Sequence, residues 1–185
     1  LYARDMNADD TLARWLAEET QLRARQAGRA AAPIAREAAQ GRSGIDLLRE
    51  MIEGQLPAAP IAQTLDFLLV QVEPGHAVFQ GRPGAAFLNP MGGLHGGWYA
   101  TLLDSCVGCA VHSTLPVGRA YTTLELKLNI VRAVGLNVPL VRAMGQVIHV
   151  GRQMATAEAK LVGPDGTLYA HATTTCLVFE MKAPR

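Results

Sequence analysis

One acidic residue stands in unusually apolar surroundings. Asp104 is the only charged residue between Arg82 and Arg119, and it lies in a stretch with the composition of a buried helix. Moving an ionised carboxylate out of water costs on the order of several kcal/mol unless it is paired or hydrogen-bonded. Acids in such settings are often functional, as a base for water or as a nucleophile. The alternative is an Asp that is capped or faces solvent.

A glycine-rich segment, residues 87–97 (FLNPMGGLHGG), leads directly into the same stretch. The first turn of a helix leaves several backbone N–H groups unpaired and carries a partial positive charge. A carbonyl oxygen about 3 Å from those donors is polarised as negative charge builds on it. For a lone Gly-Gly pair, the alternative is a tight loop that serves only helix packing. The segment lacks the spacing and the Lys-Ser/Thr pair of a phosphate-binding loop.

Spacing keeps these two features apart within one chain. Gly96 precedes Asp104 by eight residues, which is about 12 Å along an α-helix. A reacting group needs its donor and its base each within about 3 Å, so one helix cannot supply both to one substrate. If both act, Asp104 meets the Gly96 of a second copy, with the two helices antiparallel about a twofold axis. The hypothesis therefore predicts an obligate homodimer with two shared sites.

The other candidate groups are weaker. Cys106 and Cys109 have CxxC spacing, but they lie in mid-helix, away from the position that lowers a thiol pKa. A zinc site needs two further ligands, for which Cys176 with His112 is only a guess. We therefore expect buried, unreactive thiols, with no metal and no cofactor. No serine lies in a G-x-S-x-G motif, so a serine triad has no support.

Length and composition bound the architecture that must hold these groups. The chain has 185 residues, of which 49% are hydrophobic and 18% charged, as suits one folded domain with a sizeable core. The 17 Lys and Arg residues balance 16 Asp and Glu residues, which disfavours nucleic acid or a membrane surface as partner. No stretch has the pattern of a membrane span or a signal peptide, and three cysteines do not make a disulfide framework. We expect a soluble, cytoplasmic protein.

The hydrophobic period changes near residue 60, from that of a helix to that of a strand. We therefore expect an N-terminal helical extension over residues 1–56 and the main domain over residues 57–185. Two helices are expected in the extension, one capped by Asn7, Asp9 or Asp10 and one running from the capping residue Ser43 to about residue 53. Both should pack on the main domain rather than stand alone.

The main domain is predicted to combine one buried helix with a largely antiparallel sheet. Alternation of apolar and polar residues is clearest over residues 123–130 (TLELKLNI). A helix from Leu94 to about Ser113 is apolar almost all round, so it must be enclosed. These elements make an α+β architecture rather than βαβ repeats. The candidate strands are residues 63–72, 76–82, 120–133, 138–150, 153–162 and 167–180.

The ordered motifs of the main domain resemble those of the hotdog-fold acyl-CoA thioesterases, in particular the PaaI-like group of the phenylacetate pathway. The similarity covers roughly residues 55–180. It implies one long helix wrapped by an antiparallel sheet of five or six strands, an acyl-CoA substrate, and a homodimer that often pairs into a dimer of dimers. The residues that carry it are Asn89-Pro90, Gly92, LHGG at 94–97, Leu103-Asp104, TLEL at 123–126 and NIVR at 129–132.

The same resemblance implies roles for five residues in catalysis. Gly96 supplies an oxyanion-hole N–H, and His95 positions that turn. Asp104 is the catalytic carboxylate, as base or as nucleophile. Asn89 helps to hold the water or the thioester end, and Thr123 supplies a hydroxyl group.

Three further residues are expected to bind substrate. Gly97 and Trp98 lie at the start of the buried helix, where Trp98 could line an acyl pocket. Arg152 could bind the phosphates of coenzyme A. Core packing is the alternative for Trp98, and a solvated role at a strand edge is the alternative for Arg152.

Three functions remain open from the sequence. Hydrolysis of an acyl-CoA thioester is the leading hypothesis. A hotdog acyl-thioester dehydratase or hydratase is the second, although those families usually arrange an acid and a histidine differently. A non-catalytic acyl-CoA-binding protein is the third, and it has no need of Asp104. Release of free thiol from a panel of aryl and aliphatic acyl-CoAs separates the three.

Overall fold

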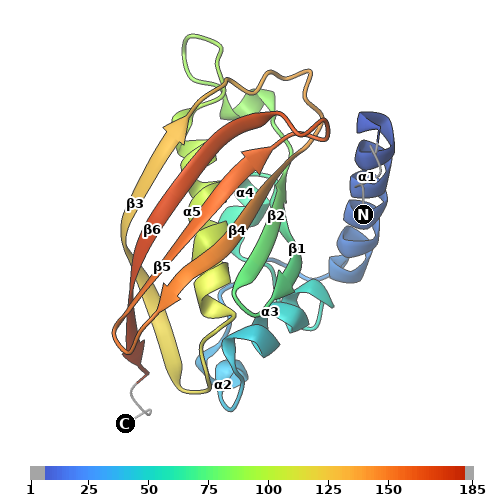
Figure 1. Ribbon diagram of the computed structural model, residues 1–185. Helices are drawn as coiled ribbons and strands as arrows, with labels where there is room; N and C mark the ends of the chain where they lie inside the picture. Colours follow the sequence, from blue (N-terminus) through green and yellow to red (C-terminus); the bar gives the residue numbers. More distant parts are fainter. Residues whose placement is uncertain (1–6, 182–185) are drawn as a thin grey trace, which may run out of the picture.

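The computed structural model describes residues 7–181. Its strands are β1 (Phe67–Glu73), β2 (His76–Gly81), β3 (Arg119–Ile130), β4 (Val141–Val150), β5 (Met154–Val162) and β6 (Leu168–Glu180). They form one antiparallel sheet in the order β1-β2-β4-β5-β6-β3, so β1 and β3 are its edges. The sheet curves around one long helix, α5 (Gly96–His112), as Figure 1 shows. This is the α+β hotdog architecture predicted from the sequence.

Three strand boundaries differ from the prediction. The first strand was expected from residue 63, but Pro60–Thr64 form a short helix, α4, and β1 begins only at Phe67. Pro60 suits the first turn of a helix, and Asp66 adopts a left-handed conformation (φ 51°) that separates helix from strand. β3 and β4 are both shorter than predicted, because a connection containing glycine and proline, residues 131–140, joins them.

The two helices predicted in the N-terminal extension begin at predicted caps, and a short helix that was not predicted lies between them. The side chain of Asn7 accepts a hydrogen bond from the Asp9 N–H, and Ser43 forms a reciprocal capping box with Asp46. The glycine at position 44 packs so closely on the end of α5 that a Cβ there would overlap the His112 carbonyl oxygen. The extension comprises α1 (Ala8–Gln26), α2 (Arg36–Ala39) and α3 (Gly44–Ile52).

The long helix is enclosed by the sheet on most of its circumference, but not on all of it. Leu102, Leu103 and Val107 are completely buried. Close packing on β4 depends on Gly145, because a Cβ there would lie 2.8 Å from the sulfur of Cys106. Along one side, however, α5 is only half-buried. That open side carries Thr101, Asp104, Ser105 and Cys109.

The first helix is tied to the β1 side of the sheet by a buried ionic network. Glu19 on α1 is 4% exposed and accepts hydrogen bonds from Arg23 (2.7 Å), Arg82 (3.1 Å) and Gln80 (2.9 Å). Burial by itself raises the pKa of Glu19, but the hydrogen bonds and charges of Arg23 and Arg82 outweigh it and lower the pKa below 4.5. The ionised form is therefore the one that holds α1 in place.

Acid should loosen this attachment. Because the pKa of Glu19 is lower in the folded state, its carboxylate stabilises the fold above about pH 4.5, and that contribution is lost as pH falls through the folded value. Glu19→Gln should cost about 1–2 kcal/mol at pH 7, or about 2–8 °C in Tm, and should flatten the acid limb of stability. Thermal melts from pH 3 to pH 7 test this, with the exposed Glu37→Gln as control. Equal acid limbs in wild type and Glu19→Gln would contradict the prediction.

Candidate active site

Asp104 projects from the open side of α5, in the middle of the helix. Its Oδ1 accepts a hydrogen bond of 3.0 Å from the hydroxyl of Thr123 on β3. Within residues 7–181 no group donates to Oδ2. The side chain is half-buried, which corrects the expectation of full burial, because the sheet leaves this side of the helix partly open and a cavity lies between it and the N-terminal extension. The structure thus brings two predicted site residues together and leaves one carboxylate oxygen open.

Two neutral side chains flank this carboxylate. Burial raises the pKa of the Cys109 thiol to about 12, and the charge of Asp104 adds to the effect. Burial also raises the pKa of Tyr121 well above its usual value, with further contributions from Cys109, Cys176 and Asp104. Both groups therefore stay protonated at neutral pH. Sequence reasoning missed Tyr121, although its position two residues before Thr123 on an alternating strand places the two on one face.

The start of α5 offers one free backbone donor. His95 is the N-cap, and its Nδ1 accepts from the Gly97 N–H at 2.8 Å. The Trp98 N–H donates to the His95 carbonyl at 2.9 Å. Among the described residues, no acceptor faces the N–H of Gly96. This geometry suits the predicted role of His95 in positioning the turn. Gly97 was expected to bind substrate, but its N–H already donates to His95.

The loop before α5 is shaped by Asn89. Its Oδ1 accepts from the N–H groups of Met91 (2.9 Å) and Gly93 (3.1 Å). Gly92 between them takes a left-handed conformation (φ 82°) that glycine adopts freely. The side-chain oxygen of Asn89 therefore organises the loop, and its amide nitrogen is the group left for the predicted role of holding a water or the thioester end.

The remaining predicted binding residues lie apart. Trp98 is 2% exposed, donates from its indole N–H to the Leu65 carbonyl at 2.9 Å and stacks on Phe87. It is a core residue with no face for substrate, because the first turn of α5 points it into the sheet. Arg152 lies exposed in the β4–β5 turn, where its carbonyl accepts from the Arg119 guanidinium. That turn is at the opposite end of the sheet from the start of α5 (Figure 1).

One continuous helix keeps Gly96 and Asp104 apart. Both belong to α5, which runs unbroken from Gly96 to His112. The separation of about 12 Å inferred from the sequence therefore applies in the folded chain. Each end of β3 is close to one of them: Thr123 bonds Asp104, while Ile130 lies beside Gly96, 3.8 Å from where a Cβ would stand. β3 thus supplies a neighbouring side chain to Asp104 and another to Gly96.

β3 is a long edge strand with an open side. Within residues 7–181 its only ladder partner is β6. The strand exposes Leu124 (62%) and Ile130 (45%), and a bulge between Thr123 and Glu125 shifts its register. A long edge with apolar side chains is a template for pairing with another strand.

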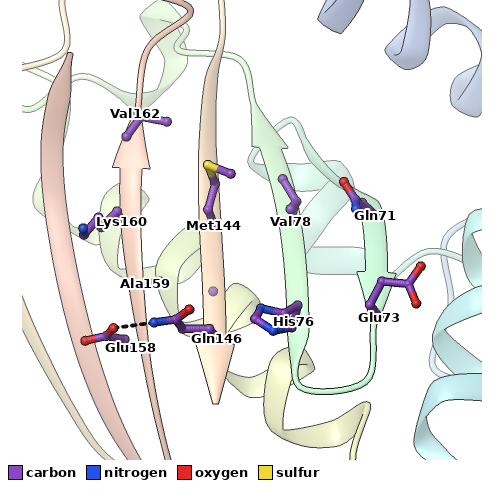
Figure 2. Close-up of a pocket in the computed structure, with 11 residues that line it drawn as sticks. Gln71, Glu73, His76, Val78, Met144, Gln146, Glu158, Ala159, Lys160 and Val162 are labelled. Atoms are coloured by element: carbon purple, nitrogen blue, oxygen red, sulfur yellow. Dashed lines mark hydrogen bonds between the residues drawn. The ribbon is translucent and has the colours of Figure 1, made fainter. Parts of the chain in front are cut away.

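The structure also has a hollow of about 550 Å³ on the outer face of the sheet (Figure 2). It is an open groove across β1, β2, β4 and β5, on the side away from α5. The amide of Gln146 donates to Glu158 there at 2.7 Å. Neither Asp104 nor Gly96 contributes to it. Although this groove is large, it is not the candidate reaction site, because it contains neither of those residues.

The cysteines do not add a second centre. Cys106 and Cys176 are buried free thiols, and burial raises the pKa of both. Over the described part of the chain, no three His, Cys, Asp or Glu side chains are grouped as a metal site. Over the same residues, every helix is too short or too polar to cross a membrane.

Known proteins resemble this chain in sequence and fold. A model of the thioesterase superfamily matches residues 91–170. The phenylacetic acid degradation-related protein of Ralstonia eutropha is 30% identical, with a TM-score of 0.64 over 70% of this chain and 98% of that one. A thioesterase family protein from Silicibacter pomeroyi is 26% identical, with a TM-score of 0.61 over 66% and 90%. A mutant of the phenylacetic acid degradation protein PaaI from Thermus thermophilus is 27% identical, with a TM-score of 0.57 over 64% and 97%. No curated protein matches the sequence.

Proposed function

We propose that this chain, which belongs to the thioesterase superfamily and is a PaaI-like thioester hydrolase of the hotdog fold, cleaves acyl-CoA thioesters at two sites shared between the subunits of a homodimer. One observation carries the proposal: the open carboxylate oxygen of Asp104 and the free N–H of Gly96 lie on one rigid helix. Since the two groups of one chain are too far apart to act on the same thioester, each must act together with the other group of a partner subunit. The division into an extension, residues 1–56, and a thioesterase domain, residues 57–185, is part of the proposal.

Pairing of the two β3 strands supplies the dimer. The bulge divides β3 into two parts, with Thr123 facing α5 before it and Leu126, Leu128 and Ile130 facing α5 after it. An antiparallel pair centred on Lys127 sets Leu126 opposite the partner's Leu128. Across the bulge, Thr123 then faces the partner's Ile130. This register places Asp104 beside the partner's Gly96, and a shift by one residue turns the inward side chains outward.

Cysteine cross-linking tests this register. Lys127→Cys should give a disulfide-linked dimer under mild oxidation, because the two Lys127 positions face each other at the twofold axis, within the Cα separation of about 4.4–6.8 Å that a disulfide needs. Glu125→Cys is the matched control: it lies on the same face of the same strand, but its two copies are about 13 Å apart in this register. Non-reducing gels check both variants against wild type. Equal cross-linking at the two positions, or none at Lys127, would contradict the register.

The chemistry follows from this arrangement. The thioester carbonyl oxygen accepts from the partner's Gly96 N–H, next to the positive end of its helix. Thr123 holds Oδ1 of Asp104, so Oδ2 is free to take a proton from a water molecule. The water oxygen attacks the carbonyl carbon, and the oxyanion forms at the Gly96 N–H. The C–S bond then breaks, and the proton held by Asp104 passes to the leaving sulfur, which gives a carboxylic acid, the free thiol and the original carboxylate. Direct attack by Asp104 is the alternative route.

The coenzyme A part of the substrate suits the arginines at the start of β3. Arg152 and Arg119 are adjacent through the bond between the Arg119 guanidinium and the Arg152 carbonyl. Within residues 7–181 neither pairs with an acid, and Arg119 Nε has no hydrogen-bond partner. Two guanidinium groups without acidic partners favour phosphate. In this register Thr123 faces the partner's Ile130 beside Gly96, so Arg119, four residues earlier on β3, lies about 13 Å beyond the reacting group.

Release of free thiol from aryl and aliphatic acyl-CoAs is the direct test of the function. Hydrolysis of at least one acyl-CoA, with equal amounts of acid and thiol, supports the proposal. Binding of acyl-CoA without release would support the acyl-CoA-binding alternative instead, and formation of an unsaturated or hydrated acyl-CoA would support the dehydratase or hydratase.

A further inference from the structure

We infer that the N-terminal extension and α4 form the far wall of the acyl pocket and restrict the enzyme to small, uncharged acyl groups. The inference rests on the proposed function, because Asp104 is what identifies the pocket. A cavity of about 210 Å³ lies directly beside Asp104, between α5, β1, α3 and α4. Unlike the outer-face hollow, it touches a residue of the candidate active site.

The walls next to Asp104 are uncharged. Ser105, Cys109 and Tyr121 line the cavity together with Asp104, which is the only charged side chain in its lining. The raised pKa values of Cys109 and Tyr121 keep both groups neutral. An acyl group that carries its own carboxylate would find no cation here and would lie close to the like charge of Asp104. The lining therefore selects uncharged acyl groups and rejects dicarboxylic ones.

The size and the middle walls of the cavity limit the acyl group further. An apolar cavity of about 150 Å³ is known to take up benzene, so this cavity has room for one aromatic ring or a short alkyl chain. Phe67 and Phe79 meet edge to face in its wall, with ring centroids 6.0 Å apart. Such a wall favours an aryl or compact aliphatic group. A long fatty chain does not fit.

The far end of the cavity is closed by residues that precede the part of the chain matched by the superfamily model. Met51 of α3 and Ala59 and Ala62 of the α4 segment line it, and Gln26 of α1 donates to the Met51 carbonyl at 3.3 Å. Ala62 is also part of the hydrophobic core. Because this wall is packed and hydrogen-bonded, it sets the depth of the pocket. The small side chains of Ala59 and Ala62 leave room for the acyl group, and the side chain of Met51 limits how deep the cavity is.

Two substitutions change that depth in opposite directions. Met51→Ala should deepen the pocket and raise kcat/KM for decanoyl-CoA at least about tenfold relative to acetyl-CoA, since one methylene in such a pocket is worth about 10–200-fold. Ala62→Leu should fill it and lower kcat/KM for benzoyl-CoA and hexanoyl-CoA about tenfold or more, with acetyl-CoA almost unaffected. Wild type should prefer benzoyl- and hexanoyl-CoA to decanoyl- and succinyl-CoA.

The control is Met144→Ala, which makes the same chemical change on the outer face of the sheet. It should leave the ratio between substrates as in wild type. Thermal melts check that each variant is folded, and Met51→Ala keeps the test open if Ala62→Leu does not fold. Unchanged ratios in an active Met51→Ala enzyme would overturn this inference alone. A wild type that hydrolyses no acyl-CoA would overturn the proposed function, and this inference with it.

Discussion

Asp104→Asn should reduce kcat by about 10²–10⁴-fold, the usual contribution of a general base. Asparagine keeps the size of the side chain and an oxygen that can accept from Thr123, but it cannot take a proton from water. The loss should therefore appear in kcat rather than in binding of the acyl-CoA. Thiol release measured at saturating substrate checks it, and gel filtration checks that the dimer is intact.

A matched control is Asp165→Asn in the β5–β6 turn, which removes another carboxylate that bonds neither Thr123 nor the start of α5. Its carboxylate accepts hydrogen bonds from Thr167 in the turn, so kcat should be unchanged. The kcat of Thr123→Ala should lie between those of Asp104→Asn and Asp165→Asn, because the substitution removes the hydroxyl that orients Asp104 but leaves the carboxylate itself. Activity of Asp104→Asn within a few-fold of wild type would refute the assignment of Asp104.

Gly96→Pro should reduce kcat by about 10²–10³-fold, as the loss of one oxyanion-hole donor does in other enzymes. Proline removes the backbone N–H, and the first helical position is the one place where a helix accepts it. His95, which precedes it, already has the extended conformation (φ −64°, ψ 136°) that proline requires of its neighbour. We therefore expect the variant to lose one hydrogen-bond donor while the helix stays intact.

Gly96→Ala is the control for this deletion. It adds a side chain but keeps the N–H, and its Cβ would meet only Ile130 at 3.8 Å, an ordinary contact. Its kcat should stay within a few-fold of wild type. If Gly96→Ala and Gly96→Pro lose activity equally, the N–H is not the functional group.

Mixing the two inactive proteins tests whether the sites are shared. A dimer of one Asp104→Asn subunit and one Gly96→Pro subunit contains one site with both defects and one site with none. After unfolding and refolding at equal amounts, half of the dimers are mixed, so activity should return to roughly one quarter of wild type. Sites contained within single subunits would give no recovery. Refolding each variant alone provides the background.

Local patterns along the chain were sufficient to predict much of this molecule. Alternation with a period of two indicates strands, and an apolar stretch closed by caps indicates a buried helix, because both follow from fixed backbone geometry. The conflict between Gly96 and Asp104 is also a property of the sequence, since the rise of a helix does not depend on what surrounds it. The α+β class, the extension helices and the need for a second subunit could all be argued on that basis.

Only the tertiary structure determined which side chains from different elements are in contact. Asp104 is half-open and bonded to Thr123, and Trp98 is buried and bonded to the Leu65 carbonyl. The residues just before β1, where the strand was expected to begin, form the short helix α4, and Ala62 of that helix lines a cavity beside Asp104 together with Met51. These contacts join residues far apart along the chain, and they depend on how the sheet curves and where it stops. A sequence pattern records the period of each element, whereas the packing of one element on another selects the neighbours of each side chain.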